Sequence, residues 1–290
     1  MMMEASLQGA ASAAPCVLEG FDPEAAFNAC VEQLQAFMDA TFGAREHHVV
    51  LGLSGGIDSA LVAVMAVEAF GPEHVHALTM PGPFTSAGTL ADARALARNL
   101  DIRLDEVAIG EAYEACCKAV EEGCFEDVRG TIAGQNIQAR LRMVMLMALS
   151  NARGWTVLNS GNLSEARMGY CTLYGDTVGA FGPIGGLLKT EVYAVANWVN
   201  ERTRAASGEA LIPEGIITRP PSAELATGQT DEDSLGITYA QLDAILARLR
   251  AGEDADALAA ESPQAAEVIR RMRANAFKGA WLPPHSVVPR

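Results

Sequence analysis

A glycine turn between a strand and a helix is the feature of this sequence that points most directly to chemistry. Residues 48–59 read HVVLGLSGGIDS, and the apolar run 49–53 predicts a buried parallel strand. Ser54, Gly55 and Gly56 allow the backbone to turn tightly and to approach a ligand closely. The apolar spacing that follows predicts a helix, so the turn lies at the positive end of a helix dipole. The segment therefore predicts a phosphate-binding loop.

Asp58, at the start of this helix, distinguishes the loop from that of phosphoryl-transfer enzymes. Those loops read G-x-x-x-x-G-K-[ST], and their Lys holds the β- and γ-phosphates of the nucleotide. An acidic residue beside a phosphate cradle requires a Mg²⁺ ion between the two negative groups. The pattern indicates a reaction in which pyrophosphate is a product.

The SGGIDS loop resembles the SGGxDS loop of the ATP pyrophosphatase superfamily. In that superfamily the loop holds the β- and γ-phosphates of ATP while a substrate attacks the α-phosphate. The resemblance implies that ATP is a substrate. It assigns the binding of the phosphates to Ser54, Gly55, Gly56, Ile57, Asp58 and Ser59.

Composition limits the classes of partner. The 290 residues are 50% hydrophobic and 20% charged, which allows one sizeable core in one or two domains. A net charge of −15 argues against a nucleic-acid partner, because such proteins bind through clustered Lys and Arg. No apolar run reaches the roughly 18 residues of a membrane-spanning helix, so no membrane partner is expected.

The cysteines and the first residues of the chain indicate the cellular compartment to expect. The sequence contains Cys16, Cys30, Cys116, Cys117, Cys124 and Cys171. They form no C-x-x-C pair, so neither a zinc knuckle nor a sulfur-relay dithiol is indicated. Residues 1–14 lack the basic region of a secretory signal, and we expect a cytoplasmic protein with reduced thiols. Residues 1–21 are expected to form a disordered extension.

Alternating helix and strand patterns predict an α/β fold. Asp22 and Pro23 predict the start of a helix that continues to about Thr41. After the phosphate loop, strands are expected at 74–80, 102–109 and 155–159, and helices at 86–99, 111–122 and 135–151. This order predicts a doubly wound parallel sheet of flavodoxin or Rossmann type, with helices on both faces and C-terminal helical additions beyond Lys189. We expect residues 22–290 to form one domain with its site at the carboxyl ends of the strands.

Four further segments narrow the resemblance to the NAD⁺ synthetases. They read N-x-x-A-R-x-R-M, N-S-G-N-L-S-E, G-Y-C-T-L-Y-G-D with a later Lys, and P-S-A-E-L with Q-T-D-E. In this sequence they are residues 136–143, 159–165, 169–176 with Lys189, and 221–225 with 229–232. Together with the phosphate loop they extend the resemblance over about residues 22–288.

Members of this family convert deamido-NAD to NAD⁺. The nicotinate carboxylate attacks the α-phosphate of ATP, which gives an acyl-adenylate and Mg-pyrophosphate, and ammonia then releases NAD⁺ and AMP. Both steps depend on positioning and charge neutralisation, since three phosphates and a carboxylate repel one another. Asp58 and Glu165 are expected to share Mg²⁺, although Glu165 also fits an exposed charge in the first turn of a helix.

The resemblance implies roles for further residues. Lys189 would neutralise phosphate charge and Asp176 would approach the nicotinate, unless they are an ordinary helix-start lysine and turn aspartate. Ser160 and Ser222 are assigned to the ATP site, and the loop that contains Ser222 and Glu224 is expected to fold over the substrate. The deamido-NAD site is assigned to Asn136, Arg140, Tyr170, Tyr174 and Asp176. Either tyrosine could stack on the nicotinate ring or be a buried core residue.

In the family, the helix that corresponds to residues 136–143 lies at a homodimer interface that forms the deamido-NAD site. The methionine-rich run 143–147 therefore belongs either to such an interface or to the core. Arg140 and Arg142 are two residues apart, so their side chains should point to different sides of the helix.

The sequence departs from the family pattern in the segment after Pro81, which reads GPFTS and lacks the Arg that family members commonly place there. Either another residue supplies that charge or the affinity for the nucleotide is weaker.

Other functions and two nitrogen sources remain open. Another ligase of the superfamily, such as the synthetase part of GMP synthase or a tRNA thiolation enzyme, leaves P-S-A-E-L and the helix 136–143 without explanation. A nucleotide-binding subunit that depends on a partner is a further alternative.

Ammonia is the expected nitrogen source, because about 50 residues before the phosphate loop cannot hold an amidase domain. The run NAFK at 275–278 nevertheless resembles the glutamine-dependent form, so a separate glutamine amidase is the alternative partner.

Overall fold

The structure, a computed structural model, describes residues 20–123 and 127–288. The disordered extension predicted for residues 1–21 therefore falls almost entirely outside the described residues. The strands are β1 (Val49–Gly52), β2 (Val75–Thr79), β3 (Arg103–Glu106) and β4 (Thr156–Val157). The helices are α1 (Pro23–Phe42), α2 (Ile57–Phe70), α3 (Ala87–Asn99), α4 (Gly110–Gly123), α5 (Ile132–Arg153), α6 (Leu163–Met168), α7 (Lys189–Ser207), α8 (Glu214–Thr218), α9 (Asp231–Leu235), α10 (Tyr239–Arg250), α11 (Ala255–Glu261) and α12 (Pro263–Asn275), with the short 3₁₀ helices η1 (Pro72–His74) and η2 (Ala276–Trp281).

The four strands formed by the described residues are all parallel and follow the order β3-β2-β1-β4. Val49 of β1 pairs with Val75 of β2 on one side and with Thr156 of β4 on the other. The chain builds β1, β2 and β3 in one direction and then returns to place β4 beside β1. The predicted doubly wound α/β fold is confirmed, and the reversal of strand order lies between β1 and β4.

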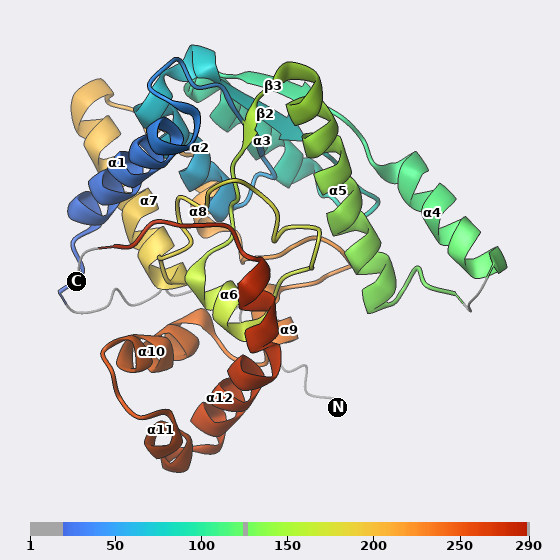
Figure 1. Cartoon of the computed structure of the whole chain (residues 1–290), viewed down its shortest axis with the longest axis vertical. Coiled ribbons are helices and arrows are strands. Elements are labelled where there is room, and N and C mark those ends of the chain that lie inside the picture. The colour runs from blue at the N-terminus through green and yellow to red at the C-terminus, as the bar shows by residue number, and fades with distance from the viewer. Residues whose placement is uncertain (1–19, 124–126, 289–290) are drawn as a thin grey trace, which may run out of the picture.

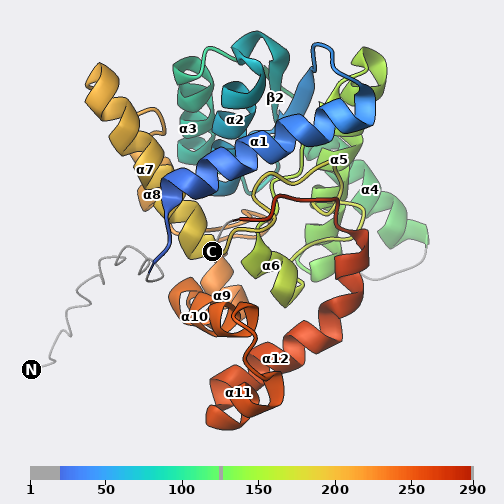
Figure 2. The ribbon, with the colours of Figure 1, turned by 60° about the vertical axis from the view of Figure 1, so that its left-hand side comes forward.

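Different helices cover the two faces of the sheet (Figures 1 and 2). Val49 and Leu51 belong to a core shared with α1, α2, α3 and α7, whereas Val50 packs with Met143 and Leu146 of α5. Successive side chains of a strand point to opposite faces, so the apolar run of β1 is buried on both sides. The phosphate loop thus follows a strand that the core holds firmly.

Helix α1 begins as the sequence predicts. The Asp22 carboxylate accepts hydrogen bonds from the backbone N–H groups of Glu24 and Ala25, and Pro23 occupies the first turn. Its apolar stripe is buried, namely Phe27, Val31, Leu34 and Met38. The helix ends one residue later than expected, at Phe42, before Gly43.

β3 and β4 are shorter than predicted, and at the end of β4 another segment competes for the backbone groups. β3 ends at Glu106, and β4 spans Thr156–Val157 alone. Leu158 still donates to the Val50 carbonyl at 2.9 Å, but it also forms an isolated bridge with Phe181. The residues after β4 are therefore held partly by a distant loop, and they leave the ladder early.

The C-terminal additions form a group of helices beyond the carboxyl edge of the sheet, where α10, α11 and α12 lie below α6 in Figure 1. Their core contains Leu188, Leu235, Leu242 and Val268, all buried. The last described segment returns to the main body, where Gly182 and His285 form a bridge.

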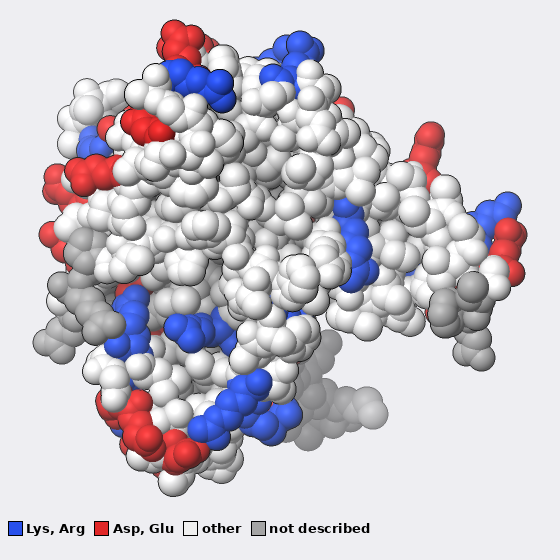
Figure 3. Space-filling model, in the orientation of Figure 1, with Lys and Arg blue, Asp and Glu red and all other residues white. Residues whose placement is uncertain are grey.

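None of the described helices combines the length and the apolar character that crossing a membrane requires. On the face drawn in Figure 3, Lys and Arg side chains gather over the lower half, and a broad area across the middle carries few charges of either sign.

Candidate active site

A cavity of about 310 Å³ opens at the carboxyl ends of β1, β2 and β4, where the strand order reverses. Ligands of doubly wound sheets bind at this position. The predicted site residues that line it are Ser54, Gly55, Gly56, Ile57, Asp58, Ser59, Ser160, Glu165, Tyr170, Asp176, Lys189 and Ser222. Asn136, Arg140 and Tyr174 lie outside this lining.

The phosphate loop is shaped by a close approach to α3. Gly55 has a φ of +86°, and a Cβ on it would lie 2.1 Å from the Thr89 carbonyl oxygen. The Ser54 and Ser59 hydroxyls are 3.0 Å apart, and Ser59 donates to the Gly56 carbonyl at 3.1 Å. Gly56 caps α2 without a side-chain hydrogen bond, so first-turn N–H groups of α2 remain available to an anion.

A buried lysine joins two carboxylates at the floor of the cavity. The Lys189 Nζ lies 2.5 Å from Asp58 Oδ2 and 3.0 Å from Glu165 Oε1, and the Lys189 side chain is only 2% exposed. Asn162 donates to Asp58 Oδ1 at 3.0 Å and also accepts the Glu165 N–H as the N-cap of α6. One asparagine therefore positions both acids, which lie in the first turns of α2 and α6, the helices that follow β1 and β4.

The charges of this cluster alter one another's protonation. Burial opposes the charge of Lys189, but Asp58 and Glu165 outweigh it, so the pKa of Lys189 lies well above its usual range. Burial raises the pKa of Glu165 to about 7, in spite of Lys189, and the charges of Asp58 and Asp231 add to this effect. The cluster therefore holds one fixed positive charge and a carboxyl group that titrates near neutrality.

Asp231 and Tyr239 complete the cluster, and the sequence did not single them out. The Tyr239 hydroxyl donates to Glu165 Oε1 and to Asp231 Oδ2, each at 3.2 Å. The Tyr170 hydroxyl donates to Asp231 Oδ1 at 3.3 Å. Burial raises the pKa of Asp231. Only its place in the Q-T-D-E segment could have indicated Asp231, whereas Tyr239 has no such signal.

The loop 169–176 contributes a second acid. Asp176 accepts the Thr172 N–H at 2.6 Å, and burial by surrounding protein raises its pKa to about 6, although its side chain is open to the cavity. From α5, Asn136 accepts the Thr172 hydroxyl at 2.7 Å and Arg140 donates to the Leu173 carbonyl at 3.1 Å. Both α5 residues thus hold the loop of Asp176 from outside the cavity.

Tyr174 lies at the outer side of the same loop. Its side chain is 59% exposed, and its ring meets Trp281 edge-on with the centroids 5.6 Å apart. Tyr174 has a φ of +63°, an unusual conformation for a residue with a bulky side chain. The structure therefore separates Tyr170, which lines the cavity, from Tyr174, which does not.

The loop 219–230 covers the phosphate loop from the other side. Glu224 accepts the Thr89 hydroxyl at 2.8 Å and the Ser86 N–H at 3.2 Å, at the start of α3. Ser222 donates to the Gln229 carbonyl at 2.6 Å. The loop is thereby connected to the same helix that contacts Gly55.

Two arginines border the cavity, and one of them lies near Pro81. Arg142 donates to the Met80 carbonyl at 3.1 Å and lies beside Gly82, whereas Arg219 pairs with Asp92. Both line the cavity. Burial lowers the pKa of Arg142 to about 10, which leaves it charged at neutral pH. Arg140 and Arg142 point to different partners, as their spacing predicts, and Arg142 is the one that reaches the cavity.

Known proteins share this architecture. The NAD synthase family model matches residues 30–281. The glutamine-dependent NAD(+) synthetase of Rhodobacter capsulatus is 47% identical over 239 residues, which are 80% of this chain and 42% of that protein. The solved NMN synthetase from Francisella tularensis has a TM-score of 0.72 at 30% identity and covers 89% of this chain and 96% of its own. The NH3-dependent NAD synthetase from Campylobacter jejuni has a TM-score of 0.68 at 29% identity and covers 90% and 97%.

The chain spans about two fifths of the length of the Rhodobacter relative. The family match nevertheless includes the phosphate loop, the Lys189 cluster and the loop of Asp176. With its parallel sheet and its site at the reversal of strand order, this chain belongs to the NAD synthase family.

Proposed function

We propose that this chain catalyses the ATP-dependent amidation of deamido-NAD to NAD⁺ through an acyl-adenylate, with release of AMP and pyrophosphate. The observation that carries the proposal is the contact of one buried ammonium group, Lys189, with Asp58 and Glu165 beside a phosphate loop. The loop lacks the Lys of enzymes that transfer a γ-phosphoryl group. Its acidic helix start favours pyrophosphate as the leaving group.

The donor set of this cluster fits Mg²⁺, which prefers carboxylate and other oxygen ligands. Asp58 and Glu165 would hold the ion, since both present oxygens to the small volume around Lys189 Nζ. When bound, Mg²⁺ would neutralise the charge that develops on the departing pyrophosphate. Lys189 supplies a fixed positive charge at the same place, and the first turn of α2 binds phosphate oxygens.

Arg142 and Arg219 take the place of the arginine that is missing after Pro81. Arg142 lies within reach of Gly82, the residue that follows Pro81, and both guanidinium groups border the cavity. The segment 82–86 therefore needs no cation of its own to provide charge for the nucleotide. We therefore expect Arg142 and Arg219 to replace the missing charge, so that the affinity for ATP is not reduced.

The deamido-NAD site extends from the cavity toward α5. Tyr170 and Asp176 border the cavity, and Asn136 and Arg140 hold the loop of Asp176 from α5. Tyr174 lies beyond them at the surface. A dinucleotide that enters between these residues would place its nicotinate end near Asp176 and the α-phosphate of ATP.

A homodimer would complete this outer part of the site. Ile132 and Val144 of α5 are 69% and 57% exposed, and Tyr174 and Trp281, whose rings contact each other, are 59% and 54% exposed. Exposed apolar groups on one helix and an adjoining loop favour burial against a second protein surface. The methionine-rich run of α5 divides between core and surface, since Met143 is buried while Val144 is not.

Ammonia is the proposed nitrogen source, in a cytoplasmic setting, and a separate glutamine amidase is the alternative. One comparison is with a glutamine-dependent enzyme and another with an NH3-dependent one. The relatives therefore support the amidation step, but they differ in the nitrogen donor that they use.

The test is product analysis with purified protein, ATP and Mg²⁺. Deamido-NAD with ammonium should give NAD⁺, AMP and pyrophosphate in equal amounts. Nicotinate mononucleotide is the matched alternative substrate, because one structural relative is an NMN synthetase. Formation of ADP and phosphate would overturn the proposed reaction, and a preference for the mononucleotide would overturn the proposed substrate.

A further inference from the structure

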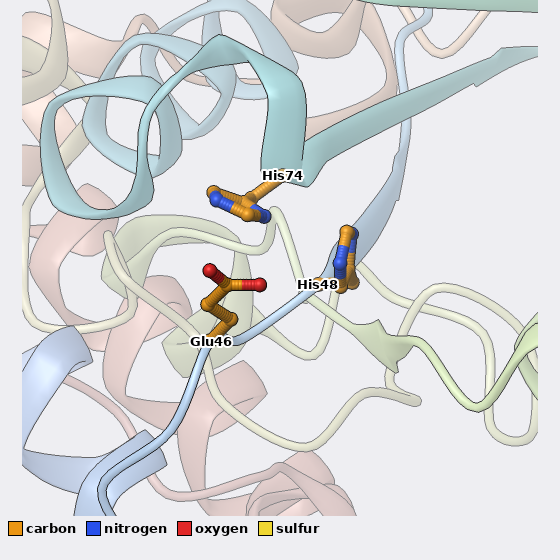
Figure 4. A group of neighbouring side chains, drawn as sticks. All are labelled: Glu46, His48 and His74. Atoms are coloured by element: carbon orange, nitrogen blue, oxygen red, sulfur yellow. The ribbon is translucent and has the colours of Figure 1, made fainter.

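A group of polar side chains lies at the opposite edge of the sheet from the phosphate loop. Glu46 and His48 precede β1, and His74 precedes β2. The candidate ligand atoms of these residues all lie within 4.8 Å of one another. Figure 4 shows the Glu46 carboxylate and the His74 ring facing each other, with the His48 ring beside them.

The strand register brings these residues together. Val49 pairs with Val75, so the residues immediately before them, His48 and His74, enter the parallel pair side by side. Side chains two residues apart in extended chain share a face, which places Glu46 with His48. The intervening His47 points the other way, is buried, and pairs with Asp39 at 2.8 Å.

His76 lies two residues after His74, in β2, next to the group. Its Nε2 lies 3.4 Å from His48 Nδ1, and its ring stacks on Trp155 with the centroids 3.5 Å apart and an interplanar angle of 4°. Trp155 therefore fixes the orientation of His76. Around this group, Glu73 lies near His74, and Arg103 is paired with Asp105.

Two of these imidazole rings have a buried nitrogen that no hydrogen bond satisfies within the described residues. They are His74 Nδ1 and His76 Nδ1. A buried polar nitrogen without a partner is costly, and such groups in folded proteins usually have a functional reason. A metal ion is one partner that draws several imidazole nitrogens and a carboxylate oxygen to one point.

We propose that Glu46, His48 and His74 form a binding site for a divalent transition-metal ion, with His76 beside His48 as a neighbour of the site. Imidazole and carboxylate ligands suit Zn²⁺, whereas Mg²⁺ prefers oxygen ligands alone. The site is distinct from the Asp58 and Glu165 pair, because it lies at the amino ends of the strands. A bound ion would fasten the segment between α1 and β1 to the segment between α2 and β2, so its effect is on stability.

The test is Zn²⁺ binding by the full chain after treatment with a chelator and in the absence of nucleotide. Zn²⁺ is titrated against a chromophoric chelator, and we expect one equivalent to bind tightly. Glu46→Gln and the double variant His48→Asn/His74→Asn should weaken binding by at least the 10- to 100-fold that loss of an outer partner costs other metal sites. His285→Asn changes an exposed histidine that is outside the group and bridges to Gly182, so it is the matched control and should bind normally.

Two further measurements separate this site from binding elsewhere. Zn²⁺ should raise the thermal unfolding temperature of the natural chain and of His285→Asn, but not that of Glu46→Gln, whose altered residue is exposed and whose fold should persist. Co²⁺ should give visible absorption without the intense near-ultraviolet band of a cobalt–thiolate bond. Unchanged binding in the double variant, or a thiolate spectrum that assigns the ion to cysteines, would overturn the proposal.

Discussion

Lys189 stays charged although it is buried, because Asp58 and Glu165 both pair with its ammonium group. Asp58 is 131 residues away along the chain and Glu165 is 24 residues away, yet both reach the same Nζ. Buried charges are stable only when paired, so removing one acid also alters the environment of the lysine. The three residues therefore act as a unit, and each substitution must be interpreted through the other two.

We expect Asp58→Asn and Glu165→Gln each to slow adenylation by on the order of a hundredfold, or ~3 kcal/mol. Each change removes an ionised oxygen from the pair that would hold Mg²⁺. Rapid-quench measurement of AMP formation at saturating Mg²⁺ tests this, with circular dichroism to verify the fold. Glu68→Gln removes a more exposed acid from the same helix as Asp58 and is the matched control. Near-normal turnover of either site variant would remove that residue from the proposed metal site.

The pH dependence of activity should report on Glu165. Burial raises its pKa to about 7, and it must ionise to bind a metal, so kcat/KM for ATP should rise with pH through about 7. Asp231→Asn removes a neighbouring negative charge and therefore lowers the pKa of Glu165. The acid limb of the profile should then move to lower pH. An unchanged limb, or one moved to higher pH, would contradict the coupling between the two acids.

At the scale of elements, the phosphate loop depends on the contact between Gly55 and α3. We expect Gly55→Ala to lower the free energy of unfolding by more than Gly208→Ala does. The two glycines have φ values of +86° and +85°, but a Cβ at Gly208 would meet nothing within 4 Å. Gly208→Ala therefore measures backbone strain alone, about 1 kcal/mol. Urea unfolding of both variants isolates the clash with Thr89, and equal losses would show that α3 moves aside.

We expect residues 219–233, which comprise the loop 219–230 and the start of α9, to be mobile without ligand and to become ordered when ATP and deamido-NAD bind. Glu224 connects this loop to Thr89 and Ser86, so Glu224→Ala should increase its cleavage by protease in the free protein. Limited proteolysis with and without both nucleotides is the measurement. Glu214→Ala changes an exposed acid just before the loop and serves as the control. Equal cleavage with and without nucleotides would contradict closure.

Local patterns predicted the elements well, and contacts between distant segments explain what they missed. The start of α1 is set by Asp22 and Pro23, so the sequence could place it. The early end of β4 depends on Phe181, which lies outside any strand pattern. The contact between Tyr239 and Glu165 joins residues 74 positions apart, so no local spacing could indicate it.

The same distinction applies to the arginines of α5. Their spacing shows that Arg140 and Arg142 face different ways, but it does not show which one faces the cavity. That depends on how α5 packs against β1 and the end of β2, where the Met80 carbonyl accepts from Arg142. The phosphate loop was predictable because strand, turn and helix are adjacent in sequence, whereas the arginines that we propose as replacements for the missing one come from other elements.

For the whole molecule, the sheet separates two kinds of chemistry. Acids, a lysine and a phosphate loop gather at the carboxyl ends of the strands, and Glu46, His48 and His74 gather at the amino ends. β1 links the two edges, since it begins after His48 and ends before the phosphate loop. A metal ion at one edge would stabilise the strand that positions the other, without direct contact with the substrates.

Three of the four cysteines in the described part of the chain are poorly suited to hydrolyse glutamine. An amidase of the nitrilase type needs a reactive thiolate, and thiolates form where the thiol pKa is lowered. Burial instead raises the pKa of Cys30 to about 12 and that of Cys171 to about 11. Cys117 is buried in a small apolar cluster beside Tyr113. These residues are suited to packing rather than to nucleophilic attack.

We therefore expect the purified chain to make NAD⁺ with ammonium and to be nearly inactive with glutamine alone. The reaction is run with glutamine as the sole nitrogen source after ammonia has been removed from the buffer, beside a matched reaction with ammonium. Addition of an unrelated glutaminase should restore activity, because it supplies free ammonia to the same cavity. Cys30→Ser and Cys171→Ser should leave both rates unchanged, since neither thiol takes part. A glutamine rate near the ammonium rate, without added glutaminase, would show that this chain generates its own ammonia and would overturn the prediction.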